Sequence, residues 1–411
     1  MWLAPVRTSL WRMTTQRTST TPTLDETRDR LLTRPFVLLA LGDLAYFTAA
    51  GVAIYTLPFY VTGPVGSDKA GAGLAFGAFA VTALVLRPYA GRLCDTVGRR
   101  PLLVGGALLC ALTMSLTAHV DTLALVVVLR LLLGVAEAAF FVASFAALAD
   151  LAPASRLGEA LSYNSLGLYL GLALGPPLGE VIVNTAGFGA AWWGAGSLAL
   201  VAAVVVARIG ETRAPRRVED RARPPLILRK ALPPSLGFFA SVFAMGGFLA
   251  FAALHADAVG LGSTSAPLLV YGMVVVTCRI AFARIPDRLP SLPLGAAALV
   301  AIATGLTLMA TWQTPAGMTI GTAVMALGVS FSTPAFFSAV FATVEPSERG
   351  AASGTVSAFL DLGIGAGPIL LGIVAQSAGI PWMFGAAAAV ALMGTAWTLS
   401  LASAEPQRAT R

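Results

Sequence analysis

Four ionisable side chains stand inside long apolar stretches of this sequence: Asp43, Arg130, Glu137 and Asp361. An ionisable side chain at the centre of a bilayer costs about 2.5–3.5 kcal/mol on insertion scales, so each of the four is a candidate functional residue. Asp43 is the first, because a carboxyl inside an apolar helix can take up and release a proton. We interpret Asp43 as a proton carrier; the alternative is an acid buried for helix packing and paired with a neighbour.

Arg130 and Glu137 form the second candidate. They stand two helical turns apart with Gly134 between them, and helical spacing places all three on one stripe. An acid and a base on one stripe can pair, and they can exchange partners when a proton or an anion arrives. A static structural ion pair is the alternative.

Asp361 and Asn164 complete the set of candidates. Asp361 shares a helical stripe with two glycines and a serine, and such a stripe faces protein or a cavity rather than lipid. Asp361 could bind a cationic substrate, carry a proton or pair across the molecule. Asn164 lies on a stripe that also carries glycines, so we expect it to hydrogen-bond a neighbouring helix.

The elements that must position these residues are apolar helices. Of the 411 residues, 57% are hydrophobic and 11% are charged, whereas a soluble domain has about 25% charged residues. A helix needs about 20 mostly apolar residues to cross a bilayer, and lipid leaves no water for unpaired backbone groups. We predict an all-α polytopic membrane protein with twelve transmembrane helices, at about 36–61, 70–90, 102–118, 123–147, 159–182, 189–207, 234–256, 266–283, 291–311, 316–343, 350–375 and 381–402.

The basic residues fall in alternate gaps between these helices. The two tails and the gaps at 91–100, 208–233 and 284–290 hold nearly all of them, and the opposite gaps hold Lys69 alone. The positive-inside rule then places both termini in the cytoplasm. The net charge of +7 is therefore a signal of topology, and we predict no nucleic-acid partner.

The sequence contains no motif for metal binding, ATP binding or hydrolytic catalysis of the common kinds. Cys94, Cys110 and Cys278 have no metal-ligand spacing, neither lysine follows a glycine, and no H-E-x-x-H or G-x-S-x-G pattern occurs. We predict no cofactor, no metal and no enzymatic activity. The first thirty residues hold no continuous apolar run, so we expect a cytoplasmic tail rather than a signal peptide, with Met13 as an alternative start to Met1.

The chain contains a repeat at an offset of 192 residues, since 279 − 87 = 192. "RPYAGRLCD" from residue 87 is echoed by "RIAFARIPD" from residue 279, and "GLALGPPLG" from residue 171 by "GIGAGPILLG" from residue 363. Two related bundles in a membrane can rock about their interface and open a central site to each side in turn. We predict six-helix bundles at 36–207 and 234–402, a cytoplasmic linker at 208–233, and tails at 1–35 and 403–411.

Three motifs make the chain resemble the major facilitator superfamily over about residues 36–402. The G-x-x-x-D-x-x-G-R-R loop of that family matches Gly91, Asp95, Gly98, Arg99 and Arg100, and its R-x-x-x-G element matches Arg130 and Gly134. The G-x-x-x-G-P-x-x-G element of its exporters matches Gly171, Gly175, Pro176 and Gly179. The sequence departs from the family at Thr96, where a basic residue is usual, and at Ser162 and Glu180, where the exporter motif has glycine.

The resemblance gives the 91–100 loop a conformational role. We expect Gly98 to form the turn, because glycine adopts backbone conformations that other residues avoid, and Pro101 to open the next helix. The resemblance implies that Asp95 lies near the cytoplasmic start of the eleventh helix, around Gly350, where the helix dipole favours a carboxylate. Asp95 would then be a latch that holds the cytoplasmic side closed; a solvated loop is the alternative.

These expectations combine into a secondary transporter that moves a small molecule by alternating access, as a monomer in the plasma membrane. The resemblance favours proton-coupled efflux, with Asp43, Arg130 and Glu137 on the proton route. A proton-coupled symporter that imports a metabolite or sugar is the main alternative, and a receptor on the same fold or a membrane-embedded enzyme are two others. The substrate is open between cations and anions, because the apolar helices carry both acids and Arg130.

Overall fold

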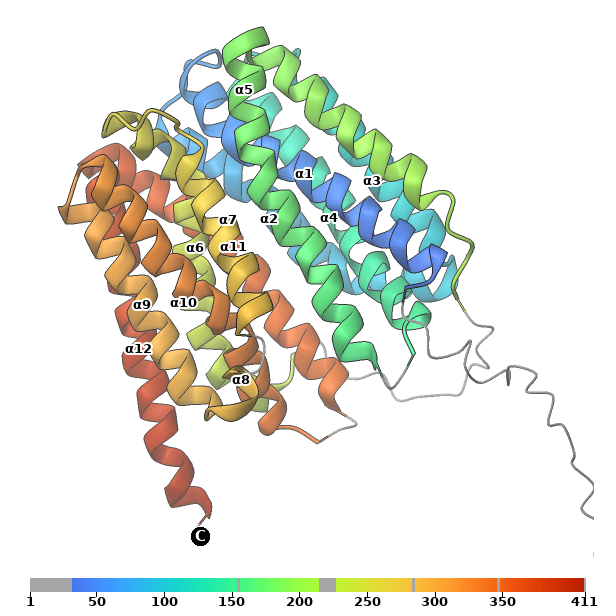
Figure 1. The fold of residues 1–411 in the computed structure, drawn as a ribbon, viewed down its shortest axis with the longest axis vertical. Helices are drawn as coiled ribbons and strands as arrows, with labels where there is room; N and C mark the ends of the chain where they lie inside the picture. Colours follow the sequence, from blue (N-terminus) through green and yellow to red (C-terminus); the bar gives the residue numbers. More distant parts are fainter. Residues whose placement is uncertain (1–31, 154–155, 214–226, 283–284, 346–347, 410–411) are drawn as a thin grey trace, which may run out of the picture.

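The protein folds into two helical bundles, one from each half of the chain (Figure 1). The structure is a computed structural model that describes residues 32–153, 156–213, 227–282, 285–345 and 348–409. Most of the predicted N-terminal tail with both candidate start methionines, the middle of the predicted linker, and the last two residues lie outside the described part.

The described elements follow the apolar stretches of the sequence. The first bundle is built from α1 (Arg34–Thr62), α2 (Lys69–Thr96), α3 (Arg99–Thr117), α4 (Leu123–Leu151) and α5 (Leu157–Val206). The second is built from a short 3-10 helix, η2 (Arg229–Ala231), and α6 (Leu232–Ala258), α7 (Ala266–Ala281), α8 (Ile285–Arg288), α9 (Ser291–Thr311), α10 (Pro315–Ala342), α11 (Arg349–Ala378) and α12 (Ile380–Ala409). Helix α12 runs to Ala409, so residues 403–409 of the predicted tail are helical.

Helix α5 contains two arms that meet at Gly187. Gly187 has φ 84° and ψ 176°, a left-handed conformation that glycine adopts at low cost. The chain doubles back there, so the first arm (157–186) and the second arm (188–206) correspond to two separate helices predicted from the sequence (Figure 1).

Ten helices of the described part are long and apolar enough to cross a membrane. The prediction of an all-α membrane protein is confirmed at this level. The prediction of twelve crossings differs from these ten at two places: α5 counts once despite its two arms, and α7, with 16 residues, is shorter than the rest.

The stretch predicted as a gap at 91–100 is largely helical. Helix α2 continues to Thr96, and α3 begins at Arg99, so Pro101 lies within the first turn of α3 rather than opening it. Gly98 makes the turn with φ 118°. The prediction was wrong about the length of the gap because the charged residues of this stretch have good helix propensity, and only Gly98 interrupts them.

The second repeat breaks where the first continues. Pro286 occupies the position of Cys94, since 94 + 192 = 286. Proline lacks the backbone N–H and its ring clashes with the preceding turn of a helix. Helix α7 accordingly ends at Ala281, and the short helix α8 begins at Ile285 with Pro286 in its first turn.

The two ends of the bundles differ in charge. The end that carries residues 97–98, 152–153, 207–213, 227–231 and 285–290, called the basic end below, holds Arg99, Arg100, Arg208, Arg213, Arg229, Lys230 and Arg288. The end that carries residues 63–68, 118–122, 259–265 and 312–314, called the neutral end, has Lys69 beside it and no other described lysine or arginine.

Small residues let α5 approach α1 closely. A Cβ atom at Gly171 would lie 2.8 Å from the Thr48 nitrogen, and one at Gly175 would lie 2.5 Å from the Thr48 oxygen. One at Gly179 would lie 3.2 Å from its nearest neighbour. The glycine–proline motif of α5 is therefore a backbone contact surface, and it is tightest at its first two glycines.

We expect Gly175→Ala to lower the free energy of unfolding by about 1–3 kcal/mol, because the added methyl group meets backbone that cannot move aside. Thermal unfolding of the purified protein in detergent measures this effect. Gly179→Ala is the matched control and should cost clearly less. Equal losses in the two variants would contradict the close contact at Gly175.

Candidate functional site

A buried ion pair joins the two bundles. Arg87 of α2 lies 2.5 Å (Nε to Oδ2) and 2.8 Å (Nη2 to Oδ1) from the carboxylate of Asp361 of α11. The side chains are 13% and 4% exposed, and the guanidinium lies over the ring of Phe141 of α4, 4.4 Å from its centroid. Asp361 therefore pairs across the molecule, one of the three roles that its sequence allows.

Glu137 stands one helical turn before Phe141, the ring under the Arg87 guanidinium. Its Oε2 accepts a hydrogen bond from the Tyr46 hydroxyl at 3.1 Å, and the Tyr46 ring stacks on Phe140 with centroids 3.9 Å apart. Glu137 also interacts electrostatically with both Arg87 and Asp361. The acid of α4 thus belongs to the same polar cluster as the ion pair between the bundles.

Asp43 is bound by neutral partners. Its side chain is 1% exposed, and Ser144 Oγ of α4 donates to both carboxylate oxygens at 2.9 and 2.8 Å. The side chain of Asn164 of α5 hydrogen-bonds the same carboxyl, while its Oδ1 is buried and has no partner among the described residues. Asp43 and Asn164, predicted separately, therefore lie in one cluster with Ser144, and Asp43 also interacts electrostatically with Glu137.

Arg130 has a different environment from Glu137. Its Nε donates to the Ala75 carbonyl of α2 at 3.1 Å, and Nη2 donates to the Phe76 carbonyl at 3.5 Å. The guanidinium lies 5.1 Å from the centroid of the Phe79 ring. The described part of the chain contains no ion pair between Arg130 and Glu137, so the pairing that their spacing allowed is not formed, and Arg130 ties α4 to the backbone of α2.

A second arginine crosses between the bundles. Arg279 of α7 donates from Nη2 to the Tyr169 hydroxyl of α5 at 3.1 Å, and its guanidinium lies 4.5 Å from the centroid of the Tyr169 ring. Sequence analysis used Arg87 and Arg279 only as markers of the repeat. Each is an ionisable residue inside a predicted apolar helix, and the criterion that selected Asp43 also selects them.

The loop at the basic end is held within the first bundle. Arg99 pairs with Asp150 of α4 at 2.8 Å and donates to the Cys94 carbonyl at 2.9 Å. Asp95 is 67% exposed on its side chain, and its described ion pair is with Arg99 at 3.4 Å. No hydrogen bond or ion pair joins Asp95 to a described side chain of α11, and the role of Asp95 as a latch stays a prediction.

Glu211 caps the start of α3. Its Oε1 accepts from the Arg99 N–H at 2.9 Å and its Oε2 from the Arg100 N–H at 3.2 Å; the Arg213 N–H also donates to Oε1. Partial burial acts to raise the pKa of Glu211, but these three backbone donors outweigh it and hold the pKa below its ordinary value. The segment after α5 is therefore bound to the 91–100 loop.

Glu180 links the two bundles at the neutral end. Its carboxylate accepts from Ser263 Oγ at 2.6 Å, from the Thr264 N–H at 2.7 Å and hydroxyl at 3.0 Å, and from the Ser265 N–H at 3.2 Å and hydroxyl at 2.5 Å. A carboxylate that receives the free donors before α7 is a helix cap supplied by another element. Sequence analysis treated Glu180 only as a departure from a glycine motif and missed this contact.

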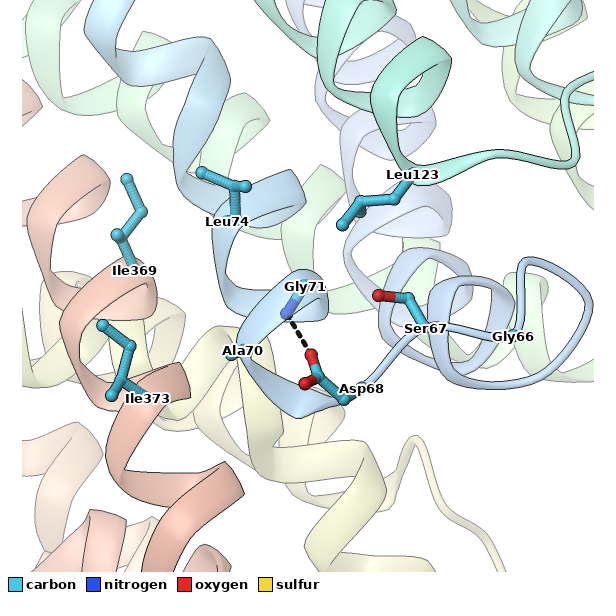
Figure 2. A pocket seen from close by; sticks show the side chains of 9 residues that line it. All are labelled: Gly66, Ser67, Asp68, Ala70, Gly71, Leu74, Leu123, Ile369 and Ile373. Atoms are coloured by element: carbon cyan, nitrogen blue, oxygen red, sulfur yellow. Dashed lines mark hydrogen bonds between the residues drawn. The ribbon is translucent and has the colours of Figure 1, made fainter.

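A cavity of about 700 Å³ opens at the neutral end, between α2, α4 and α11 (Figure 2). Two leucines and two isoleucines line much of it, and Asp68 is its charged residue. The Asp68 carboxylate accepts the Gly71 N–H at 2.8 Å and so caps α2. Because the Asp68 carboxylate caps α2 and the rest of the lining is mostly apolar, this cavity offers no free charged group to a substrate.

Two helical bundles with charged side chains between them are the architecture typical of secondary membrane transporters. The family model of the Major Facilitator Superfamily matches residues 39–320 and 294–411. An uncharacterized MFS-type transporter of Salmonella typhimurium is 30% identical over 375 residues, which cover 88% of this chain and 94% of that protein. The MFS-type transporter YhhS of Escherichia coli is 28% identical over 379 residues, 88% of this chain and 92% of that protein. The chain belongs to the Major Facilitator Superfamily, and it is a transporter rather than an enzyme.

Solved structures show the same fold. A bacterial homolog of the human lysosomal transporter Spinster, in an inward-facing and occupied conformation, has a TM-score of 0.75 and 14% identity, and the match covers 90% of this chain and 96% of that one. The human organic anion transporter MFSD10 has a TM-score of 0.68 and 20% identity, with coverage of 89% and 99%. At these identities the likeness establishes the fold alone.

We expect Arg87→Met to lower the free energy of unfolding by about 3–5 kcal/mol, because it leaves the Asp361 carboxylate buried without its partner. Arg87→Met combined with Asp361→Leu should recover most of that loss. Denaturation in mixed micelles measures both variants. The control is the ion pair between Lys230 and Glu348, 3.3 Å apart and 59% and 32% exposed, whose loss should cost less than about 1 kcal/mol. Additive losses in the double variant would contradict a coupled pair.

Glu211→Gln should lower thermal stability at pH 7, and the difference from the wild type should shrink as the pH falls below the ordinary glutamate pKa of about 4.3. The folded pKa of Glu211 lies below its unfolded value, so its stabilisation is present above the unfolded pKa and is lost as the pH falls through the folded pKa. Unfolding temperatures of the two proteins at a series of pH values measure this trend. A difference that is independent of pH would contradict the role of the ionised carboxylate.

Proposed function

We propose that this protein is a proton-coupled transporter that works by alternating access and exports its substrate in exchange for protons. The observation that carries the proposal is the ion pair between Arg87 and Asp361, which joins the bundles beside Glu137. Protonation of a carboxyl in this cluster removes a charge that holds Arg87. Proton binding and movement of the bundles are then coupled through the same side chains.

Asp43 is the residue that we propose to carry the proton. Its described partners are a hydroxyl and an amide, and these groups can hydrogen-bond a carboxyl in either protonation state. Ser144 Oγ donates to the ionised form and can accept from the protonated form. The Asn164 Oδ1, buried without a described partner, offers a second acceptor for that proton. A positively charged partner would instead hold the carboxylate in its ionised form.

Contacts between the bundles support a conformation that is closed at the neutral end. Glu180 binds residues 263–265 there, the Tyr55 hydroxyl lies 2.8 Å from Thr264 Oγ1, and the Lys69 N–H donates to Gln376 at 3.2 Å. The described contacts at the basic end lie within one bundle or the other. We propose that the basic end opens to the cytoplasm in this state, with both termini on that side, because basic loops remain cytoplasmic.

The proposed transporter has twelve membrane crossings. We count each arm of α5 and the short helix α7 as crossings, which gives two pseudo-symmetric bundles of six, at residues 36–207 and 234–402. The protein would act as a monomer in the plasma membrane. Efflux is favoured over uptake because the glycine–proline motif of α5, which resembles that of exporters, forms the tight contact with α1.

Proton release from everted membrane vesicles tests this function. Respiration acidifies the vesicle interior, and compounds of different charge are then added one at a time while a fluorescent dye reports the internal pH. We expect at least one compound to release protons from vesicles that contain the wild-type protein. Asp43→Asn should abolish this release while the protein still inserts and elutes as a single species.

The matched control is Asp121→Asn, an exposed acid between α3 and α4, which should release protons as the wild type does. Unchanged proton release by Asp43→Asn would overturn the role of Asp43. Silent vesicles combined with uncoupler-sensitive accumulation in intact cells would replace export by symport.

A further inference from the structure

The two arginines that cross between the bundles are related by the internal repeat. Arg87 maps onto Arg279, since 87 + 192 = 279, and Tyr169 maps onto Asp361, since 169 + 192 = 361. The contacts follow the same repeat: Arg87 binds Asp361, and Arg279, the counterpart of Arg87, binds Tyr169, the counterpart of Asp361. The same contact between the bundles therefore occurs twice, with a carboxylate as the partner of the arginine in one copy and a phenol in the other.

Because Tyr169 stands where the other repeat has Asp361, the guanidinium of Arg279 has no counter-charge among the described residues. Arg279 forms no ion pair with any acid of the described residues, and its Nε is buried without a partner there. Its described hydrogen bond is a single one, to a neutral hydroxyl. A guanidinium has five N–H donors, so the half-buried Arg279 keeps donors without a described partner and a positive charge that no described acid neutralises.

The Tyr169 ring holds the guanidinium in a defined orientation. The guanidinium carbon lies 4.5 Å from the ring centroid, within the cation–π range, and Nη2 donates to the hydroxyl of the same ring. The other N–H donors of Arg279 make no described hydrogen bond, and a guanidinium can bind an oxyanion with two parallel hydrogen bonds. Tyr169 therefore positions Arg279 without neutralising it.

Arg279 is half-buried and lies between the bundles, since it reaches Tyr169 of α5. It stands near the end of α7, about 20 Å along the helix from its start at 1.5 Å per residue. Outside it, Gly272 packs closely on Ala173, and residues 263–265 bind Glu180. A ligand that enters between the bundles from the basic end would meet Arg279 before these closed contacts.

We propose that Arg279, positioned by Tyr169, binds the anionic group of the substrate, and that the substrate is an organic anion: a carboxylate, sulfonate or phosphonate on an apolar or aromatic body. The ligand supplies to Arg279 the negative charge that Asp361 supplies to Arg87. This assignment rests on the proposed transport function and names the substrate class that the function leaves open.

The decisive variant restores the missing counter-charge. Tyr169→Asp gives Arg279 the partner that Arg87 has, so a bound anion would compete with a permanent carboxylate. Tyr169→Asn is the matched control, because asparagine has the size of aspartate but no charge. We expect Tyr169→Asp to weaken the apparent affinity for anions at least about tenfold relative to Tyr169→Asn, in line with the strength of close charge pairs at interfaces.

Two readouts use the same probes. Benzenesulfonate, salicylate and phenylphosphonate are the anions, benzyl alcohol is the neutral probe and benzyltrimethylammonium the cation. Ligand-induced thermal stabilisation of the full chain, purified in an uncharged detergent, reports binding, and proton release from everted vesicles reports transport. We expect the anions alone to act in both assays, and vesicles without the protein correct for passive entry.

Each other outcome has a definite meaning. A response to the cation or the neutral probe but to none of the anions overturns the anion site and leaves the transport function standing. Equal anion affinities in Tyr169→Asp and Tyr169→Asn overturn the role of Arg279. No response to any probe in either assay counts against the transport function as well. If the Tyr169 variants do not fold, Arg279→Lys should retain weakened anion binding and Arg279→Gln should lose it; equal binding by these two overturns the proposal.

Discussion

A charge that has left water must find a partner, and the pair of Arg87 and Asp361 is where this constraint joins the two bundles. Within lipid the cost of an unpaired ion far exceeds that of a lost packing contact. The arrangement of α2 against α11 therefore has to keep these two side chains together in this state. Glu137 and Asp43 extend the same cluster into the first bundle, so these buried ionisable groups lie at or beside the interface between the bundles.

Much of the fold could be predicted from the sequence, because the signals for it are local. Apolar length marks the helices, and the alternation of basic gaps marks their ends. The repeat at 192 residues predicts two bundles from the echo of Arg87 in Arg279. The helix that runs through Gly91 and Asp95 was missed, since charged residues were taken to mark a gap although they continue a helix well.

The candidate site was predicted only in part. Asp43, Asn164, Glu137 and Asp361 could be selected because each is a polar residue in an apolar helix. Their partners could not, because Ser144 and Arg87 lie in other helices and meet them only in three dimensions. The contact expected for Asp95 was predicted for a conformation closed at the cytoplasmic side, and a sequence does not say which conformation a structure shows. Glu180 was misjudged for a similar reason: it was compared with a motif instead of with the residues that it reaches.

The repeat is informative where its two halves differ. Gly372 is the counterpart of Glu180, since 180 + 192 = 372, and a Cβ atom at Gly372 would lie 3.0 Å from the Lys69 carbonyl. At the neutral end, one of the two repeat-related contacts between the bundles is therefore made by close backbone packing and the other by hydrogen bonds to a carboxylate. Likewise Tyr169 is the repeat counterpart of Asp361, and Pro286 is the repeat counterpart of Cys94. Duplication supplied two equivalent crossings, and each was then free to take a separate task.

Glu180 also separates two properties that evolution must tune in a transporter. The five hydrogen bonds that it accepts come from three consecutive residues, 263–265, in a loop at the neutral end. Replacing a serine or threonine there changes the hydrogen bonds that join the bundles, while Arg279 and Asp43 keep their surroundings. Under the proposed transport cycle, turnover can then adapt to a new temperature or membrane through this loop alone, and the choice of substrate is inherited unchanged.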